Sequence, residues 1–144
     1  MTIFVVRSPR AMRDNNSTNP TPRDTAAEKA TDKGRRAEQA AAVFLARQGL
    51  RVIARNYHCR GGEIDLICRD GDALVFVEVR QRRSRRFGGA AASITPAKQR
   101  RILLAARHYL AGEKRPDAAC RIDCVLIDGE NIDWVRNAFD AATD

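Results

Sequence analysis

The fold is decided by one stretch of the chain, which reads GEIDLICRDGDALVFVEVR at residues 62–80. Its two arms, 62–69 and 73–80, are rich in residues that favour β-strands, and the tight-turn signal DGD separates them. A glycine at the first central position is typical of a two-residue hairpin turn. The stretch therefore predicts an antiparallel β-hairpin.

The register of this hairpin brings acidic side chains together. A two-residue turn places Asp65 directly opposite Glu78, and Glu63 opposite Arg80, on the same face. Carboxylates whose Cβ atoms lie about 4.5–5.5 Å apart destabilise a strand pair unless a cation, a shared proton or a basic side chain compensates. Two interpretations stay open: a Mg²⁺ or Mn²⁺ site that acts on a phosphodiester, and a salt-bridged cluster neutralised by Arg80 and neighbouring arginines.

The other face of the hairpin is expected to be core. The apolar residues predicted on that face are Ile64, Leu66, Cys68, Val75, Val77 and Val79. The charged face also becomes apolar towards the hairpin tip, where it carries Ile67, Leu74 and Phe76. The acids are therefore expected at one end of a largely covered surface.

The segments around the hairpin predict two helices and three further strands. The predicted helices cover 34–48, ended by Gly49, and 96–112, with Thr95 as N-cap. The further strands are expected at 51–57, 121–128 and 132–136. This αβββαββ order predicts an α/β domain over 34–144, with a central mixed sheet flanked by helices. Residues 1–33 lack apolar periodicity and are interpreted as a disordered tail.

The composition restricts the class of protein. A chain of 144 residues with 44% hydrophobic content suffices for one domain with a core. No apolar run approaches the roughly 20 residues of a membrane span, and residues 3–6 are shorter than the ~7–15 apolar residues of a signal peptide, so we expect a cytoplasmic protein. The four cysteines do not have the spacing of a zinc site.

Positive charge is concentrated in one segment. The net charge of the chain is +8, and residues 80–115 carry eleven Lys and Arg against the single acid Glu113. This favours phosphate-backbone binding over a merely solubilising face. The expected nucleic-acid contacts are Arg82, Arg83, Arg85, Arg86, Arg100 and Arg101. Because aromatic residues are sparse in this segment, duplex or branched DNA is the expected partner, and no apolar face accompanies the charge to suggest a membrane surface.

Two helical residues are further candidates for the acidic site. Glu38 borders the apolar stripe of the first predicted helix, although an acid near a helix start is also explained by the helix dipole. Lys98 lies in the first turn of the second helix, where the dipole disfavours a cation, and it shares a stripe with Ile102 and Tyr109. A catalytic Lys98 and an ordinary exposed lysine both remain open.

Several blocks of sequence, in order along 34–139, resemble the YraN family of small bacterial proteins, uncharacterised protein family 0102. They read GRRAEQAA, RNYHCRGGEIDLI, LVFVEVRQR, FGGAAASITPAKQRRI and CRIDCVLI. That family is regarded as having the restriction-endonuclease-like fold of the PD-(D/E)XK nucleases and is similar to archaeal Holliday-junction resolvases. The resemblance implies a Mg²⁺- or Mn²⁺-dependent endonuclease that hydrolyses DNA, with a homodimer as a further expectation.

Carried over by position, the nuclease motif makes Asp65 and Glu78 the metal ligands, with the Val79 carbonyl and the more distant Glu38 as additions. Arg80 occupies the position of the motif's catalytic lysine, and Ile64 that of its proline. Arginine can stabilise phosphate charge but cannot act as a base at neutral pH. The resemblance therefore leaves a rival function, a DNA-binding or scaffolding module with a nuclease-like fold and little or no turnover.

Overall fold

The computed structural model describes residues 22–81, 94–115 and 118–139, and only the backbone of residues 22–30. Its elements, in order, are α1 (Pro22–Arg47), β1 (Arg51–Cys59), β2 (Gly62–Asp70), β3 (Ala73–Gln81), α3 (Pro96–Gly112), β4 (Cys120–Asp128) and β5 (Asn131–Val135). The strands form one sheet in the order β1-β2-β3-β4-β5, in which β3 and β4 are parallel and the other neighbours antiparallel. The predicted α/β class with a mixed sheet is confirmed.

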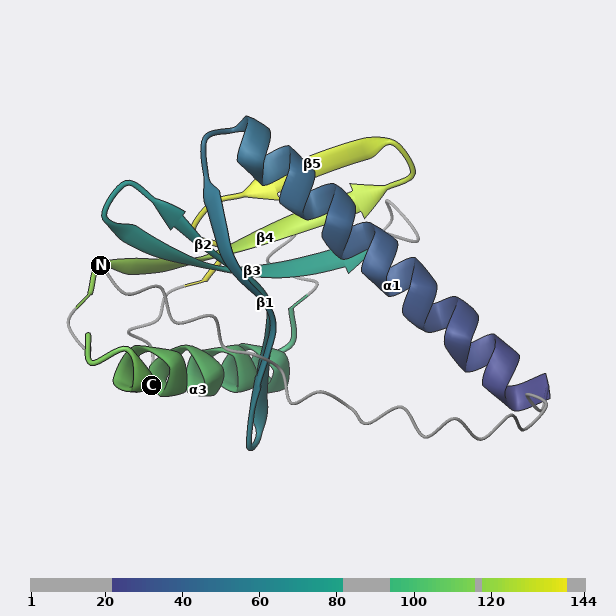
Figure 1. Cartoon of the computed structure of the whole chain (residues 1–144), viewed down its shortest axis with the longest axis horizontal. Helices are drawn as coiled ribbons and strands as arrows, with labels where there is room; N and C mark the ends of the chain where they lie inside the picture. The colour runs from purple at the N-terminus through teal and green to yellow at the C-terminus, as the bar shows by residue number, and fades with distance from the viewer. Residues whose placement is uncertain (1–21, 82–93, 116–117, 140–144) are drawn as a thin grey trace.

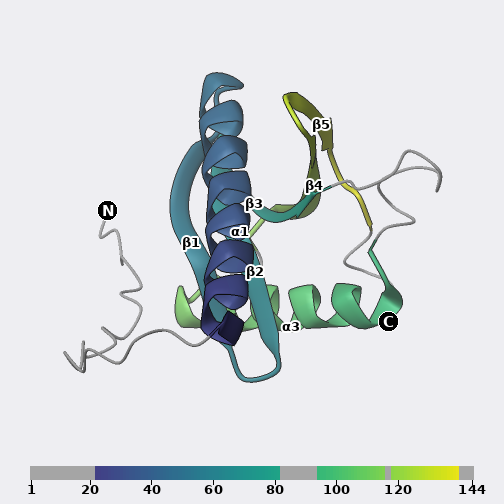
Figure 2. The same ribbon diagram turned by 90° about the vertical axis from the view of Figure 1, so that its right-hand side faces the viewer.

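The two helices cover opposite faces of the sheet (Figure 1, Figure 2). Strand side chains alternate between the two layers, so Phe76 packs under α3 while its neighbours Val75 and Val77 pack under α1. The α3 layer buries Ile102 and Tyr109, as the predicted stripe on that helix requires. Each helix therefore has its own hydrophobic core, and the acidic end of the hairpin lies between them.

Helix α1 begins earlier than its apolar pattern predicts. It starts at Pro22 instead of Gly34, and its first half extends beyond the sheet (Figure 1). The segment 22–33 has proline at the first helical position and several alanines, which favour a helix. Because this part of the helix does not pack on the sheet, its sequence needs no apolar residues at helical spacing. The predicted division into a tail over 1–33 and a domain over 34–144 is otherwise untested, since residues 1–21 lie outside the described ranges.

The predicted C-terminal end of the first helix and the predicted N-cap of the second are confirmed. Gly49 adopts φ +96°, and the N–H of Leu50 donates to Leu45 O at 3.0 Å, which closes α1 with a glycine cap. At the start of α3, Thr95 Oγ1 accepts a hydrogen bond from the Lys98 N–H at 3.2 Å. This cap fixes the first turn of α3, and with it the backbone of Lys98.

The predicted hairpin register is confirmed from Asp70↔Ala73 to Leu66↔Val77, where the β2–β3 ladder ends. The predicted face of Ile64 is wrong. Ile64 packs in the α3 layer, whereas Leu66 packs in the α1 layer. The alternation breaks at Asp65, between the pairs Arg55↔Leu66 and Tyr57↔Ile64, and Asn56 in the same interval of β1 has a φ of 50°. A left-handed residue in a strand twists it locally, and here the twist turns Ile64 to the other side.

The β1–β2 turn packs directly on α3. A Cβ atom at Gly62 would lie 2.4 Å from Arg101 O and 3.0 Å from Ala105 N, so only glycine allows this approach. The contact brings the start of β2 against the first turns of α3. No helix in the described ranges is long and apolar enough to cross a lipid bilayer.

Candidate functional site

Beyond Leu66 and Val77 the strands β2 and β3 separate, and a carboxylate enters the gap between them. The backbone N–H of Val79 donates to Asp65 Oδ2 at 2.8 Å, which replaces a strand-to-strand hydrogen bond. The predicted opposition of Asp65 with Glu78 and of Glu63 with Arg80 is therefore not continued as ladder pairing. Lys98 nevertheless connects Glu63 with Glu78, Arg80 contacts Glu78, and Asp65 interacts with the Glu78 side chain.

Glu78 is a nearly buried carboxyl, with 5% of its surface exposed. Burial raises its pKa to about 8, the nearby Asp65 carboxylate acts in the same direction, and the positive charges of Lys98 and Arg80 oppose both. Among the described residues, its Oε2 atom is buried and has no hydrogen-bond partner. Such an atom is costly to bury unless a proton or a cation satisfies it.

Lys98 joins two of the acids. Its Nζ atom lies 2.8 Å from Glu63 Oε1 and 3.7 Å from Glu78 Oε1. Burial lowers the pKa of Lys98, but the hydrogen bond to Glu63 and the charges of Glu78 and Glu63 outweigh burial, so the pKa is raised overall. The same hydrogen bond lowers the pKa of Glu63. Lys98 is therefore held as a cation facing the acids.

Arginines lie at the border of the cluster. Arg80 Nε is 3.5 Å from Glu78 Oε1, and Arg101 places a guanidinium nitrogen 3.8 Å from Glu63 Oε1. Both are ion pairs beyond the usual hydrogen-bond distance, and the two positive charges act to lower the pKa of Glu78 and of Glu63. Arg100 is exposed on α3. The predicted contacts Arg82, Arg83, Arg85 and Arg86 lie outside the described residues.

Glu38 on α1 approaches the cluster from the other layer. Burial raises its pKa, and the charge of Asp65 acts in the same direction, whereas a hydrogen bond with the Asn56 side chain lowers it. Among the described residues, no three His, Cys, Asp or Glu side chains lie close enough to hold one metal ion together. Glu38 therefore lies beside the Asp65–Glu78 pair without completing a three-residue ligand set.

The donor chemistry of the Asp65–Glu78 pair fits a hard divalent cation. Mg²⁺ typically takes one or two protein carboxylates and completes its shell with waters and substrate phosphate oxygens. The Oε2 atom of Glu78 has no partner among the described residues, and burial and the Asp65 side chain raise the pKa of this carboxyl, so it holds a proton unless a cation replaces it. A dication could take the place of that proton, so the pair fits such an ion without a third acid.

Two features of the structure were missed by the sequence reasoning. Glu63 is the hydrogen-bond partner of Lys98, although its position in the GEIDL block predicted an opposition to Arg80. Asp123 on β4 is fully buried and accepts hydrogen bonds from the Arg121 Nε, the Trp134 Nε1 and the Asn137 N–H. A lone acid within the apolar run CRIDCVLI is the signal for such a satisfied structural carboxylate.

The histidines and cysteines do not complete the cluster. His58 is exposed, with Nδ1 3.8 Å from Glu63 Oε2, while His108 contacts the hydroxyl of Tyr57. All four cysteines are free. Burial raises the pKa of Cys68 and of Cys124 to about 12, which makes both thiols unreactive.

Together these features define an α/β protein with a buried Glu78 beside a half-buried Asp65, a lysine and flanking arginines at the point where two strands diverge. The sequence profile of uncharacterised protein family UPF0102 matches residues 37–127. A UPF0102 protein of Dechloromonas aromatica is 64% identical over 111 residues, which cover 77% of this chain and 91% of that protein. One from Nitrosomonas europaea is 61% identical over 114 residues, which cover 77% and 96%.

A UPF0102 protein of Cupriavidus taiwanensis is 58% identical over 110 residues, which cover 76% of this chain and 83% of that protein. The chain belongs to the UPF0102 family, which is the YraN family suggested by its sequence blocks.

Proposed function

We propose that this protein is a Mg²⁺- or Mn²⁺-dependent endonuclease that hydrolyses DNA phosphodiester bonds, with the restriction-endonuclease-like fold of the PD-(D/E)XK nucleases. The observation that carries the proposal is the Asp65–Glu78 pair, in which a buried Glu78 oxygen has no partner among the described residues. Two adjacent carboxylates suit a hard cation that shares its remaining positions with phosphate oxygens.

Asp65 and Glu78 would hold the ion, with the Val79 carbonyl as an additional ligand and Glu38 behind them. When bound, Mg²⁺ or Mn²⁺ supplies Lewis-acid activation of the scissile phosphate and of an attacking water. The Val79 N–H orients the Asp65 carboxylate by binding Oδ2. This bond restricts the orientation of the Asp65 side chain, which also interacts with the Glu78 side chain.

Lys98 would add a second cation beside Arg80, which occupies the lysine position of the motif. Its ammonium lies 3.7 Å from Glu78 Oε1, on the side where a phosphate would meet the acids. Because contacts with Glu63 and Glu78 raise its pKa, Lys98 stays protonated and acts by stabilising negative charge on phosphorus-bound oxygens, not as a base. Arg80 would contact another phosphate oxygen.

The arginines of the segment 82–86, with Arg100 and Arg101, would bind the DNA backbone around the scissile bond. The proposed substrate is duplex or branched DNA, and cutting two strands would require a homodimer. The arginine at position 80 also supports a second candidate, a DNA-binding module with little or no turnover.

The test uses a four-way DNA junction and a linear duplex of the same sequence, each with Mg²⁺, Mn²⁺ or EDTA. We expect divalent-dependent cleavage by the wild type, and a rate about 100-fold lower for Asp65→Asn. Asp72→Asn in the exposed β2–β3 turn is the matched control and should cleave normally.

Absence of cleavage by the wild type in every condition would reject the nuclease. DNA binding that persists in Asp65→Asn and weakens steeply with salt would then support the binding module. Cleavage by Asp65→Asn at the wild-type rate would show that the activity arises elsewhere.

A further inference from the structure

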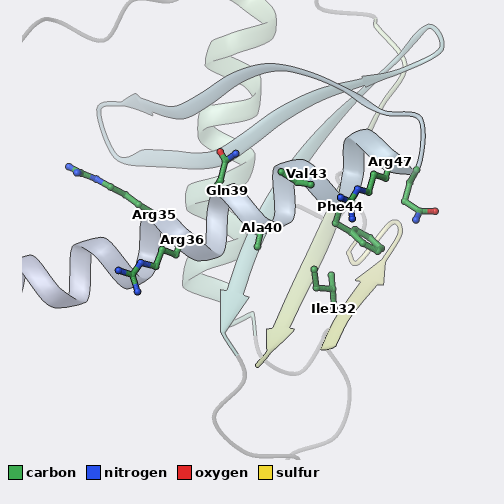
Figure 3. Close-up of a pocket in the computed structure, with 9 residues that line it drawn as sticks. Arg35, Arg36, Gln39, Ala40, Val43, Phe44, Arg47 and Ile132 are labelled. Atoms are coloured by element: carbon green, nitrogen blue, oxygen red, sulfur yellow. The ribbon is translucent and has the colours of Figure 1, made fainter. Parts of the chain in front are cut away.

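A groove with an apolar floor runs along α1 on the side away from the acidic cluster. Its volume is about 750 Å³, and Ala40, Val43 and Phe44 of α1 line it together with Ile132 of β5. Figure 3 shows the Phe44 ring directed towards Ile132. Val43 is 39% exposed, which makes it one of two large hydrophobic side chains that the described part of the chain leaves open to solvent.

The border of this groove is basic. Arg35, Arg36 and Arg47 line it, and no Asp or Glu is among its lining residues. A smaller hollow of about 440 Å³ adjoins it, shares Arg36 and adds Lys33. In Figure 3, Arg36 and Arg47 lie towards the two ends of the apolar floor. The groove thus combines uncovered apolar surface with positive charge at both ends.

The length and position of the groove limit its occupant. Arg36 and Arg47 are separated by about 16 Å along the helix axis, which about five residues of extended peptide would span. Glu38 lies on the opposite side of α1, because two residues turn a helix by about 200°. An occupant of the groove therefore does not cover the acidic cluster.

The chemistry of the groove favours an acidic peptide over nucleic acid. A DNA backbone could pair with the arginines, but its charged outer surface has no large apolar group to cover Val43 and Phe44. A peptide with carboxylates at both ends and one large apolar side chain between them satisfies both parts of the surface.

We propose that the groove between α1 and β5 docks an acidic peptide segment of a partner protein. One large apolar side chain of the segment fills the floor between Phe44 and Ile132, and its flanking carboxylates pair with Arg36 and Arg47. This site is independent of the proposed nuclease activity, and the two proposals fail or succeed separately.

The test uses the full chain and fluorescence anisotropy of a fluorescein-labelled peptide of about nine residues, with aspartates flanking a central phenylalanine. A second peptide has serine in place of that phenylalanine. We expect the phenylalanine peptide to bind at least about fivefold more tightly than the serine peptide. Its affinity should fall at least about fivefold in the Arg36→Glu/Arg47→Glu double variant, and likewise in Val43→Asp.

Matched controls lie elsewhere on the surface. Arg60→Glu in the β1–β2 turn reverses an exposed charge, and Leu104→Asp changes the other exposed large hydrophobic residue, on α3. Both should bind the peptide within about twofold of the wild type. Circular dichroism of each variant verifies that the helix content is unchanged.

Three results would overturn the proposal. The first is equal binding of the phenylalanine and serine peptides, which would reduce the interaction to unspecific charge. The second is unchanged binding in the folded groove variants, or equal weakening in the controls. The third is a duplex DNA whose affinity falls in the groove variants as much as that of the peptide, which would make the groove part of a nucleic-acid surface.

Discussion

The backbone N–H of Val79 donates a hydrogen bond of 2.8 Å to Asp65 Oδ2, across two strands whose ladder has already ended. A side chain thus takes over the role of a backbone carbonyl, which fixes Asp65 and leaves the neighbouring Glu78 beside it. This single bond connects the local fold of the hairpin to the geometry of the candidate site.

The bond predicts different outcomes for two substitutions of Asp65. In Asp65→Asn the amide oxygen still accepts from Val79, so stability should stay near that of the wild type. In Asp65→Ala the Val79 N–H loses its partner, which should cost about 1–3 kcal/mol. Urea unfolding of the three proteins measures the difference, and equal stability of the two variants would contradict the structural role assigned to this bond.

The raised pKa of Glu78 predicts a loss of stability with rising pH. Its pKa is about 8 in the folded chain, against 4.5 for the ordinary value that the unfolded chain approaches. Between these values the folded state holds a proton that the unfolded state has released, so stability from this group falls as pH rises through the window and is constant above it. Below the lower value both states are protonated and nothing is lost.

Glu78→Gln removes this titration, so unfolding free energies of wild type and variant should diverge between about pH 5 and pH 8, by an amount on the order of a few kcal/mol in favour of the variant. Near pH 8, where fewer protons compete for the Glu78 carboxylate, added Mn²⁺ should restore stability to the wild type. It should not do so in Glu78→Gln. Parallel pH profiles of the two proteins would contradict the assignment.

The contact between Lys98 and Glu63 predicts a positioning role for Glu63 in the proposed cleavage. Lys98→Met removes the cation and should lower kcat by about 10²-fold, whereas Glu63→Gln keeps the cation but loosens it, for a loss of about tenfold with KM for DNA little changed. Glu130→Gln, in an exposed turn, is the control. If Glu63→Gln retains full kcat, Lys98 does not depend on Glu63.

Two glycine substitutions are expected to change the stability of the fold in opposite directions. Gly62→Ala forces its Cβ against the backbone of α3 and should destabilise the fold by about 1–3 kcal/mol or more. Gly34→Ala in α1 meets no atom within 4 Å and should stabilise it by about 0.5–1 kcal/mol. Thermal unfolding separates the two, and a neutral Gly62→Ala would show that the turn can move away from α3.

Local signals predicted much of the fold. The DGD turn determines the register from Asp70 inward, and the caps at Gly49 and Thr95 mark the helix ends, because each rests on contacts within a few residues. The first half of α1 was not predicted, since a helix without a packing partner has no apolar period to detect. The face predicted for Ile64 was also wrong. Asn56, whose positive φ twists the sheet there, belongs to the neighbouring strand, so the hairpin sequence alone does not reveal the twist.

The sequence indicated which residues belong to the candidate site better than it indicated the contacts between them. Spacing and resemblance selected Asp65 and Glu78, while its place in the first turn of a helix made Lys98 a further candidate. The structure places Lys98 near Glu78. The link from Lys98 to Glu63 could not be predicted, because it depends on how the turn at Gly62 packs on α3. Such long-range packing has no signature in the separate segments.

The two buried thiols lie in different layers, Cys124 under α3 and Cys68 under α1. Each becomes accessible to a thiol reagent only when its own side of the sheet is uncovered. The chain therefore carries a built-in pair of chemical reporters, which can tell detachment of one helix from detachment of the other during slow labelling of the native protein.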